Sequence, residues 1–281
     1  MTTKSTSELV KELRERTGVG MGKCKDALDK ARGNMDKAIE ILRKEGLASA
    51  VKKEGRAATE GLIGCGESKD AISMVEVNSE TDFVAQNEQF KEFVAEVAHV
   101  AATKKSPSLE KLLQEPSQKD TSLTLDQRRS LVVQKLGENI RVKRVHIIPK
   151  SADHSIGTYM HMGGKIVAAV VLAGAAGQEA FAREIAMHTA AADPLYLKEI
   201  PSEVRAKEEE IARSQVVGKP PEIAAKIVQN KVQLFCSEMC LLYQPFIKDP
   251  KVTIAQLIEQ ESKRLGKPLV VEAFYRWKVE G

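Results

Sequence analysis

The glycine-rich stretch Gly18–Lys23, which reads GVGMGK, is the first part of the chain that could bind a phosphate. Glycine-rich loops that end in Gly-Lys cradle nucleotide phosphates with their backbone N–H groups. That motif needs a glycine where this chain has Thr17 and a Ser or Thr where it has Cys24. The stretch also lies between two expected helices rather than after a strand. We therefore expect no nucleotide to bind here.

Histidine and cysteine side chains could ligate a metal or act as nucleophiles, but their spacing fits neither use. His154 and His161 flank a short expected strand and should lie on opposite faces of it. The cysteines are scattered along the chain, at Cys24, Cys65, Cys236 and Cys240. This spacing predicts neither a disulfide framework nor a zinc site. Because no nucleophile motif occurs either, we expect a protein that is not an enzyme and holds no metal or cofactor.

The segment Asn78–Asn87, NSETDFVAQN, combines an acid with the first aromatic residue of the chain, Phe83. One interpretation is local: Thr81 or Asp82 caps a short helical turn, and Phe83 packs onto the helix that follows. The other is that Phe83 is an exposed wedge beside the charge of Asp82. Burial of such a side chain in a partner would contribute roughly 2–3 kcal/mol. The residues alone leave both interpretations open.

The elements that must position these residues begin with a compact module of three short helices over residues 1–46. Ser5 and Glu8 have the spacing of a capping box, and Asn34 can cap the third helix. An apolar stripe runs along each helix. Because so small a module has little core, it is suited to docking on another protein. Residues 47–60 are small and charged, and we interpret them as a linker whose first residues can be helical.

The rest of the chain is expected to form two α+β core subdomains, residues 61–150 and 151–281. The first begins with a strand hairpin, continues with an amphipathic helix over residues 88–102, and then contains a polar loop over residues 104–123. The second carries a helical hairpin at about residues 202–244. The predicted fold class is therefore α+β.

An internal comparison relates the two subdomains. Residues 71–103 and 166–193 each read as an apolar strand, a connection and an amphipathic helix. The aligned helices place His99 and His188 at equivalent positions, which indicates that these histidines are structural rather than catalytic. The connection in the second copy is small and bland, whereas Asn78–Asn87 is longer and chemically specific. The architecture alone does not require those additional residues.

The composition, with 42% hydrophobic and 29% charged residues, is typical of a soluble globular protein. The sequence lacks a transmembrane run and a signal-peptide core, so we expect a cytoplasmic protein without membrane contacts. The net charge of +4 lies within residues 1–60. That segment alternates in sign and has no aromatic residues, which favours a solvated helical surface over direct nucleic-acid binding. An RNA-associated protein is the alternative from a different class.

Motifs spread over nearly the whole chain resemble those of one known family. They are LVKELRERTGVGMGKCKDAL at residues 9–28, EVNSETDFVA at 76–85, GENIRVKRV at 137–145, IAMHTAA at 185–191, GKPPEIA at 218–224, QPFIKDP at 244–250 and FYRWKV at 274–279. Together they are similar to the motifs of bacterial translation elongation factor Ts. That family exchanges the guanine nucleotide of elongation factor Tu.

The resemblance implies a use for the separate parts of the chain. The N-terminal helices would be a ubiquitin-associated-like module that docks on elongation factor Tu in its GDP-bound and nucleotide-free forms. Lys25 in this module and His161 after Tyr159 match other contact residues of the family. The helical hairpin would protrude, and in some members such a hairpin is tied to dimerisation, which makes a homodimer an expectation here.

The resemblance also assigns the aromatic-acid segment. The residues that would enter elongation factor Tu near its magnesium ion are Thr81, Asp82, Phe83 and Val84. Phe83 would be a wedge between partner helices, and Asp82 would support the displacement. GDP release would follow from this disturbance during translation elongation.

Overall fold

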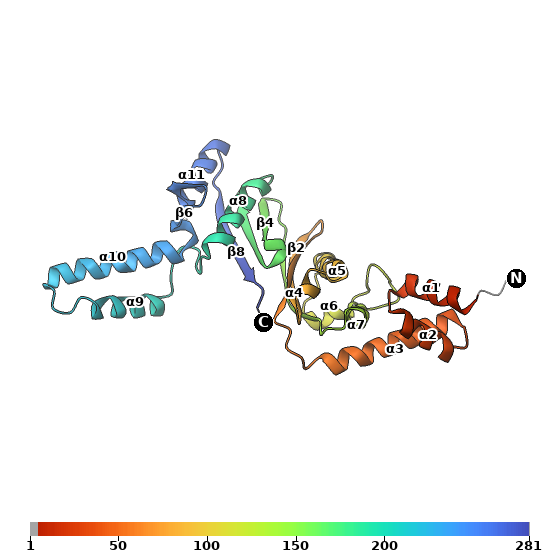
Figure 1. Ribbon diagram of the computed structural model, residues 1–281. Coiled ribbons are helices and arrows are strands. Elements are labelled where there is room, and N and C mark those ends of the chain that lie inside the picture. Colours follow the sequence, from red (N-terminus) through yellow and green to blue (C-terminus); the bar gives the residue numbers. More distant parts are fainter. Residues whose placement is uncertain (1–4, 281) are drawn as a thin grey trace. The chain divides into compact units, whose positions relative to one another are not determined.

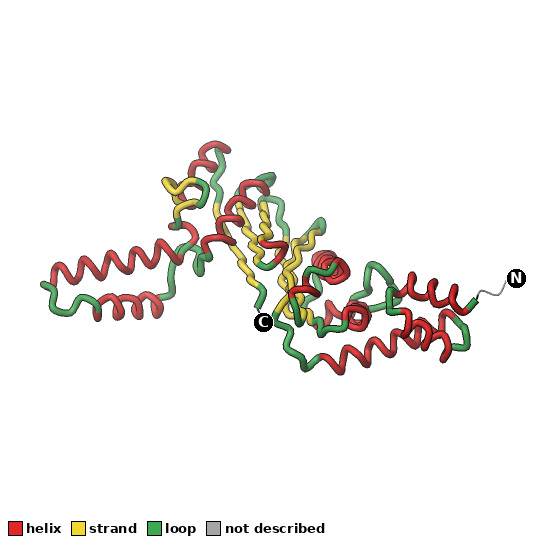
Figure 2. Tube along the Cα trace, in the orientation of Figure 1, coloured by secondary structure: helices red, strands yellow, loops and turns green. Residues whose placement is uncertain are grey.

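The computed structural model describes residues 5–280, and its fold class is α+β, as predicted (Figure 1). Helices and small antiparallel sheets share the chain (Figure 2). The chain forms two compact units. The first unit consists of the chain up to Pro149 together with the segment that begins at Lys278, and the second unit is Lys150–Trp277. Within the described residues, no helix combines the length and apolar character needed to cross a membrane.

Three helices open the first unit: α1 Thr6–Thr17, α2 Met21–Lys30 and α3 Met35–Lys53. The capping box is confirmed, because the Ser5 hydroxyl accepts the Glu8 N–H and the Glu8 carboxylate accepts the Ser5 N–H. Asn34 caps α3, as predicted. The helices enclose a small core whose fully buried members include Leu13, Cys24, Ala27 and Ala38.

Helix α3 continues into the segment interpreted as a linker. Residues 47–53 are helical because no proline interrupts them and they pack on α7, Leu125–Leu136. Gly46 lies so close to α7 that a Cβ added there would approach the Gln134 side chain to 3.3 Å. Ala50 is buried in the core of the first unit. The non-helical part of the segment therefore begins only after Lys53.

The first sheet contains β1 Glu60–Glu67, β2 Ala71–Ser79 and β3 Arg141–Pro149, with β2 in the middle and both pairs antiparallel. The short helix α4, Asp82–Ala85, and the long helix α5, Glu88–Lys104, follow β2. Helix α5 packs on β1 and β2 (Figure 1). Gly66 makes this close approach feasible, since an added Cβ would lie 2.1 Å from the Ala98 carbonyl oxygen.

The expected polar loop over residues 104–123 contains a helix, which corrects that prediction. Helix α6, Leu109–Gln114, is capped by Ser108, whose hydroxyl accepts the Lys111 N–H at 3.3 Å. Leu112 is fully buried in the core. Six residues are too few for a periodic pattern, so only the cap could have indicated this helix.

The second unit repeats the strand order of the first. Its sheet contains β4 His154–His161, β5 Ile166–Ala173 and β8 Val270–Lys278, with β5 in the middle. Helix α8, Glu179–Ala192, packs on β4 and β5. His188 in α8 is buried and lies 2.9 Å from the Gln244 side-chain oxygen, whereas His99 in α5 is exposed. The two histidines therefore share a sequence position but not an environment.

The helical hairpin consists of α9 Ser202–Ser214 and α10 Pro221–Met239 (Figure 1). The 3-10 turn Leu241–Tyr243, the strands β6 Pro245–Phe246 and β7 Asp249–Thr253, and helix α11 Ile254–Leu265 follow. The two short strands were not predicted, because segments this short show no alternation that sequence patterns can reveal.

Residues near the C-terminus form hydrogen bonds with polar side chains of the first sheet. Glu76 is fully buried in β2, and its carboxylate accepts the Glu280 N–H at 3.0 Å and pairs with Arg144 at 2.7 Å. The Glu280 carbonyl oxygen accepts hydrogen bonds from Asn78 at 3.0 Å and from Lys143 at 2.9 Å. A buried carboxylate needs such partners, since an unpaired buried charge is costly.

Candidate functional site

The segment Thr81–Ala85 forms a single helical turn between β2 and α5. Thr81 is its N-cap, and the Thr81 hydroxyl accepts the Val84 N–H at 3.4 Å. The Ala85 and Gln86 N–H groups close the turn on the carbonyl oxygens of Thr81 and Asp82, at 3.2 and 2.9 Å. The predicted cap is thus confirmed for Thr81.

Phe83 points into solvent and is 85% exposed. Val84 is half-buried and packs against the core of the first unit, and Ala85 is fully buried. Successive residues of a helix are about 100° apart, so a turn that buries Ala85 directs Phe83 elsewhere. The interpretation in which Phe83 packs onto the following helix is wrong, because Val84 and Ala85 provide that contact.

The exposure sets Phe83 apart from the other phenylalanines. The chain has seven, and the remaining six are buried or half-buried. An exposed Phe forgoes roughly 2–3 kcal/mol of burial free energy that a partner surface would supply. Asp82 beside it is also exposed, so the turn presents an apolar group and a negative charge together.

A carboxylate outside the segment holds the turn in place. Glu138, just after α7, accepts the backbone N–H groups of Glu80 and Thr81 at 3.1 and 3.0 Å, and the Thr81 hydroxyl at 2.6 Å. Reasoning from the sequence missed this residue. Glu138 lies in the family motif GENIRVKRV, but nothing in that motif indicates that residue 138 contacts residue 81.

Lys25 lies on the exposed side of α2. Its neighbour Cys24 is fully buried and donates its thiol hydrogen to the Val19 carbonyl oxygen at 3.3 Å. Because Cys24 faces the core of the module, the next residue of the helix, Lys25, faces solvent. Burial raises the pKa of the Cys24 thiol, which keeps this side chain neutral and structural.

His161 ends β4 in the second unit and is exposed. Its ring stacks on Tyr159 with centroids 6.2 Å apart and an interplanar angle of 24°, and the guanidinium of Arg183 lies 5.5 Å from the centre of the same tyrosine ring. Met162 follows with φ of 49° and is 68% exposed. Thr81, Asp82, Phe83 and Val84 thus share one turn, Lys25 lies on another element of the first unit, and His161 lies in the second.

Comparisons with known proteins bear on the whole chain. The family model described as "Elongation factor TS" matches residues 80–280. The chain is 50% identical to elongation factor Ts of Protochlamydia amoebophila over 276 residues, 98% of each chain. It is 44% identical to the protein of the same name from Chlamydia trachomatis serovar L2, and 43% identical to that from Chlamydia felis, each over 97% of both chains.

The chain belongs to the elongation factor Ts family. The family model begins at residue 80 and therefore includes the whole Thr81–Val84 turn, His161 and the helical hairpin. The relatives extend the similarity over nearly the full length, including most of the N-terminal helices.

Groups for metal or thiol chemistry do not gather within the described part of this elongation factor Ts family member. Among residues 5–280, no three His, Cys, Asp or Glu side chains are grouped so that they could hold a metal ion. All four cysteines are free. Burial raises the pKa of Cys65 to about 11, so its thiol stays protonated and is a poor nucleophile at neutral pH.

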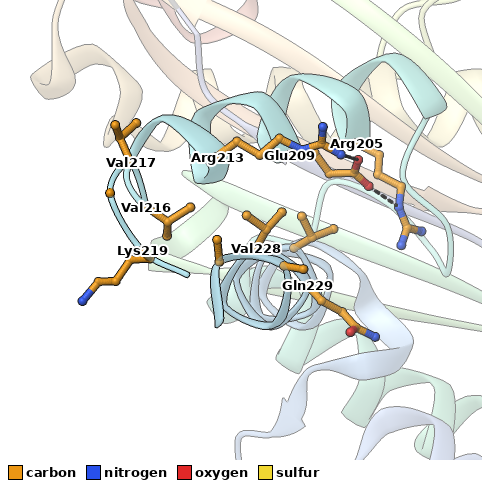
Figure 3. A pocket seen from close by; sticks show the side chains of 12 residues that line it. Arg205, Glu209, Arg213, Val216, Val217, Lys219, Val228 and Gln229 are labelled. Atoms are coloured by element: carbon orange, nitrogen blue, oxygen red, sulfur yellow. Dashed lines mark ion pairs between the residues drawn. The ribbon is translucent and has the colours of Figure 1, made fainter. Parts of the chain in front are cut away.

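A hollow of about 580 Å³ lies along the hairpin of this family member, between α9 and α10. Figure 3 shows Glu209 between Arg205 and Arg213 on α9, with the ion pairs at 3.5 and 3.8 Å. A small buried apolar cluster in the hairpin consists of Ala212, Val216 and Val228.

Proposed function

We propose that this protein is a guanine-nucleotide exchange factor that binds elongation factor Tu in the cytoplasm and promotes GDP release during translation elongation. The observation that carries the proposal is the exposure of Phe83 on an anchored turn. Membership of the elongation factor Ts family supports the identity of the partner. The turn would disturb the magnesium and nucleotide site of the partner, with Phe83 as the wedge.

The chemistry of the turn suits this use. Phe83 supplies apolar area that is out of water only when a partner covers it. Asp82 places a negative charge next to the wedge, where it could compete for groups that surround a cation or a phosphate. Thr81 and Val84 act within the turn, Thr81 as its cap and Val84 as its contact with the core. No covalent step is required, so no enzyme activity is proposed.

Exchange follows from thermodynamic linkage. A factor that binds the nucleotide-free partner more tightly than the nucleotide-bound one must weaken nucleotide binding by the same factor. A 10⁴-fold difference corresponds to roughly 5.5 kcal/mol, and burial of one Phe supplies only about 2–3 kcal/mol. Other contacts must therefore share the work, and we assign Lys25 and His161 to this role because both are exposed on ordered elements.

The remaining parts have supporting roles in the proposal. The N-terminal helices, with their small core, would dock on the nucleotide domain of elongation factor Tu. The hairpin α9–α10 has large apolar side chains on its surface, Ile211, Val217, Ile223 and Leu234, which is compatible with a homodimer contact. We propose no cofactor and no direct contact with nucleic acid.

The test is the release of labelled GDP from elongation factor Tu with and without this protein. We expect the full-length chain to accelerate release at micromolar concentration. An unchanged release rate would exclude the exchange function. Binding to RNA with a steep dependence on salt would instead support an RNA-associated role, since phosphate contacts release counterions.

A further inference from the structure

The helical turn that presents Phe83 is too short to be stable without contacts from other elements. Helix α4 contains four residues, and nucleation of an isolated helical turn is unfavourable because several dihedrals are fixed for one hydrogen bond. The Thr81 hydroxyl caps it at the long distance of 3.4 Å. Groups from other elements must therefore keep this turn in the conformation that exposes Phe83.

Glu138 provides those groups from across the fold. Its carboxylate accepts three hydrogen bonds, from the N–H of Glu80, the N–H of Thr81 and the Thr81 hydroxyl. Hydrogen bonds to a charged acceptor are stronger than those between neutral groups. Gly137 directs Glu138 toward the turn, because it ends α7 in the left-handed region with φ of 83°, where residues other than glycine are strained.

The next residue adds a reciprocal contact. The Asn139 N–H donates to the Glu80 carboxylate at 2.6 Å, so Glu80 and Glu138 bind each other's segments. The buried side chain of Asn139 donates to the carbonyl oxygens of Glu54 and Arg56, at 3.3 and 2.8 Å. The chain that leaves α3 is thus bound to Asn139, the residue whose N–H also binds Glu80.

We propose that Glu138 is a positioning residue for exchange: it fixes the Thr81–Val84 turn, so that Phe83 is presented to the partner without a further ordering cost. The inference rests on the proposed exchange function. Preorganisation of this kind lowers the entropy lost on association. Glu138 is not assigned a contact with the partner, and its effect is exerted through Phe83.

The same unit offers a matched control. Glu96 in α5 accepts the N–H groups of Gln118 and Lys119 at 3.0 and 3.3 Å and the hydroxyl of Ser117. It therefore binds a loop with the same kinds of hydrogen-bond donor as Glu138, two backbone N–H groups and one hydroxyl, and it also pairs with Arg128 at 3.5 Å. Removal of Glu96 should loosen residues 117–119 and leave the Phe83 turn unchanged.

The experiment compares Glu138→Ala and Glu96→Ala in the full-length protein by amide hydrogen exchange and by release of labelled GDP from elongation factor Tu. In Glu138→Ala we expect the amides of Glu80 and Thr81 to exchange at least about tenfold faster, and GDP release to slow about tenfold, the factor that one charged hydrogen bond represents. Glu96→Ala should show fast exchange at residues 118 and 119 with GDP release unchanged.

A double-mutant cycle with Phe83→Ala separates positioning from general damage. If Glu138 acts through Phe83, then Glu138→Ala should slow release no further in the Phe83→Ala background. If Glu138→Ala slowed GDP release equally in the wild-type and Phe83→Ala backgrounds, the inference would be overturned. It would also be overturned if Glu138→Ala released GDP at the wild-type rate while the amides of Glu80 and Thr81 exchanged fast. Should Glu138→Ala not fold, Glu138→Gln replaces it, because the amide keeps one acceptor oxygen and should give an intermediate rate.

Failure of the inference and failure of the function have different signatures. A wild-type chain that does not accelerate GDP release would remove the exchange function itself. An active wild type with an equally active Glu138→Ala would remove only the positioning role. Slow amides at Glu80 and Thr81 in Glu138→Ala would show that other contacts hold the turn.

Discussion

Phe83 and Phe90 lie seven residues apart on consecutive helices and have opposite environments. Phe83 is 85% exposed, and Phe90 is fully buried in the core of the first unit. The difference arises because Val84 and Ala85 occupy the inward side of the short turn. Burial of Phe90 therefore stabilises the first unit, whereas Phe83 lies on the surface and adds little to the stability of the fold.

This difference predicts a separation of stability from activity. Phe83→Ala should change the free energy of unfolding by less than about 0.5 kcal/mol, since it removes an exposed side chain, and should slow GDP release. Phe90→Ala should cost roughly 3–5 kcal/mol because it leaves a cavity. Denaturant unfolding and labelled-GDP release measure the two effects. A Phe83→Ala variant that exchanged like wild type would make Phe83 an ordinary surface residue.

Asp82 should contribute through its charge rather than its shape. Asp82→Asn keeps the size of the side chain, and we expect it to slow GDP release by several fold, while Glu88→Gln, at an 82% exposed side chain on the next helix, should not. Because interactions of exposed charges are screened, the effect of Asp82→Asn should shrink at high salt. An effect independent of salt would argue for a role in local structure instead.

Lys25 and His161 should contribute independently of each other. They lie on α2 and at the end of β4, in different compact units, and substitutions without shared partners are usually additive. Lys25→Ala and His161→Ala should each weaken binding to nucleotide-free elongation factor Tu by roughly fivefold to tenfold, the loss expected of one interface contact. Calorimetric titration of both single variants and the double variant tests this. No loss in either single variant would remove that residue from the contact surface.

His154 should give the second unit a pH-dependent contribution to stability. Its ring nitrogens lie 2.5 Å from Glu272 and 2.8 Å from Asp153, and hydrogen bonds to these carboxylates, Glu272 first, raise the pKa of His154. The stabilisation is fully present below the unfolded-state pKa of about 6.5 and is lost as the pH rises through the higher folded-state pKa. The difference in unfolding free energy between wild type and His154→Gln should therefore be larger at about pH 5.5 than at about pH 8.5. Glu272→Gln should remove most of this dependence, and a difference that is constant with pH would contradict the assignment.

Local sequence signals predicted the elements well where the signal lies within one element. The capping box of Ser5 and Glu8 and the cap at Asn34 were both predictable, because each involves residues within one helical turn. The continuation of α3 to Lys53 depends on packing of Gly46 and Ala50 against other elements. The residues themselves allowed a helical start to the linker, but they could not give the end of the helix at Lys53.

The candidate site was predictable in part for the same reason. Phe83 and Asp82 were selected by residue type, and the cap was predicted at Thr81 or Asp82. The direction of Phe83 could not be derived, because it depends on Val84 and Ala85 facing the core. Glu138 could not be derived either, since it is 57 residues from Thr81 in the chain and reaches it only in the folded protein.

The buried carboxylate of Glu76 also sets an order of events during synthesis. One of its partners is the N–H of Glu280, so residue 280 must have left the ribosome before this contact can form. Residues 150–277 are thus an insertion within the first unit. A nascent chain that has emerged only as far as Pro149 holds Glu76 and Arg144 but lacks the Glu280 N–H, so the first unit acquires this hydrogen bond only after residues 150–277 have been synthesised.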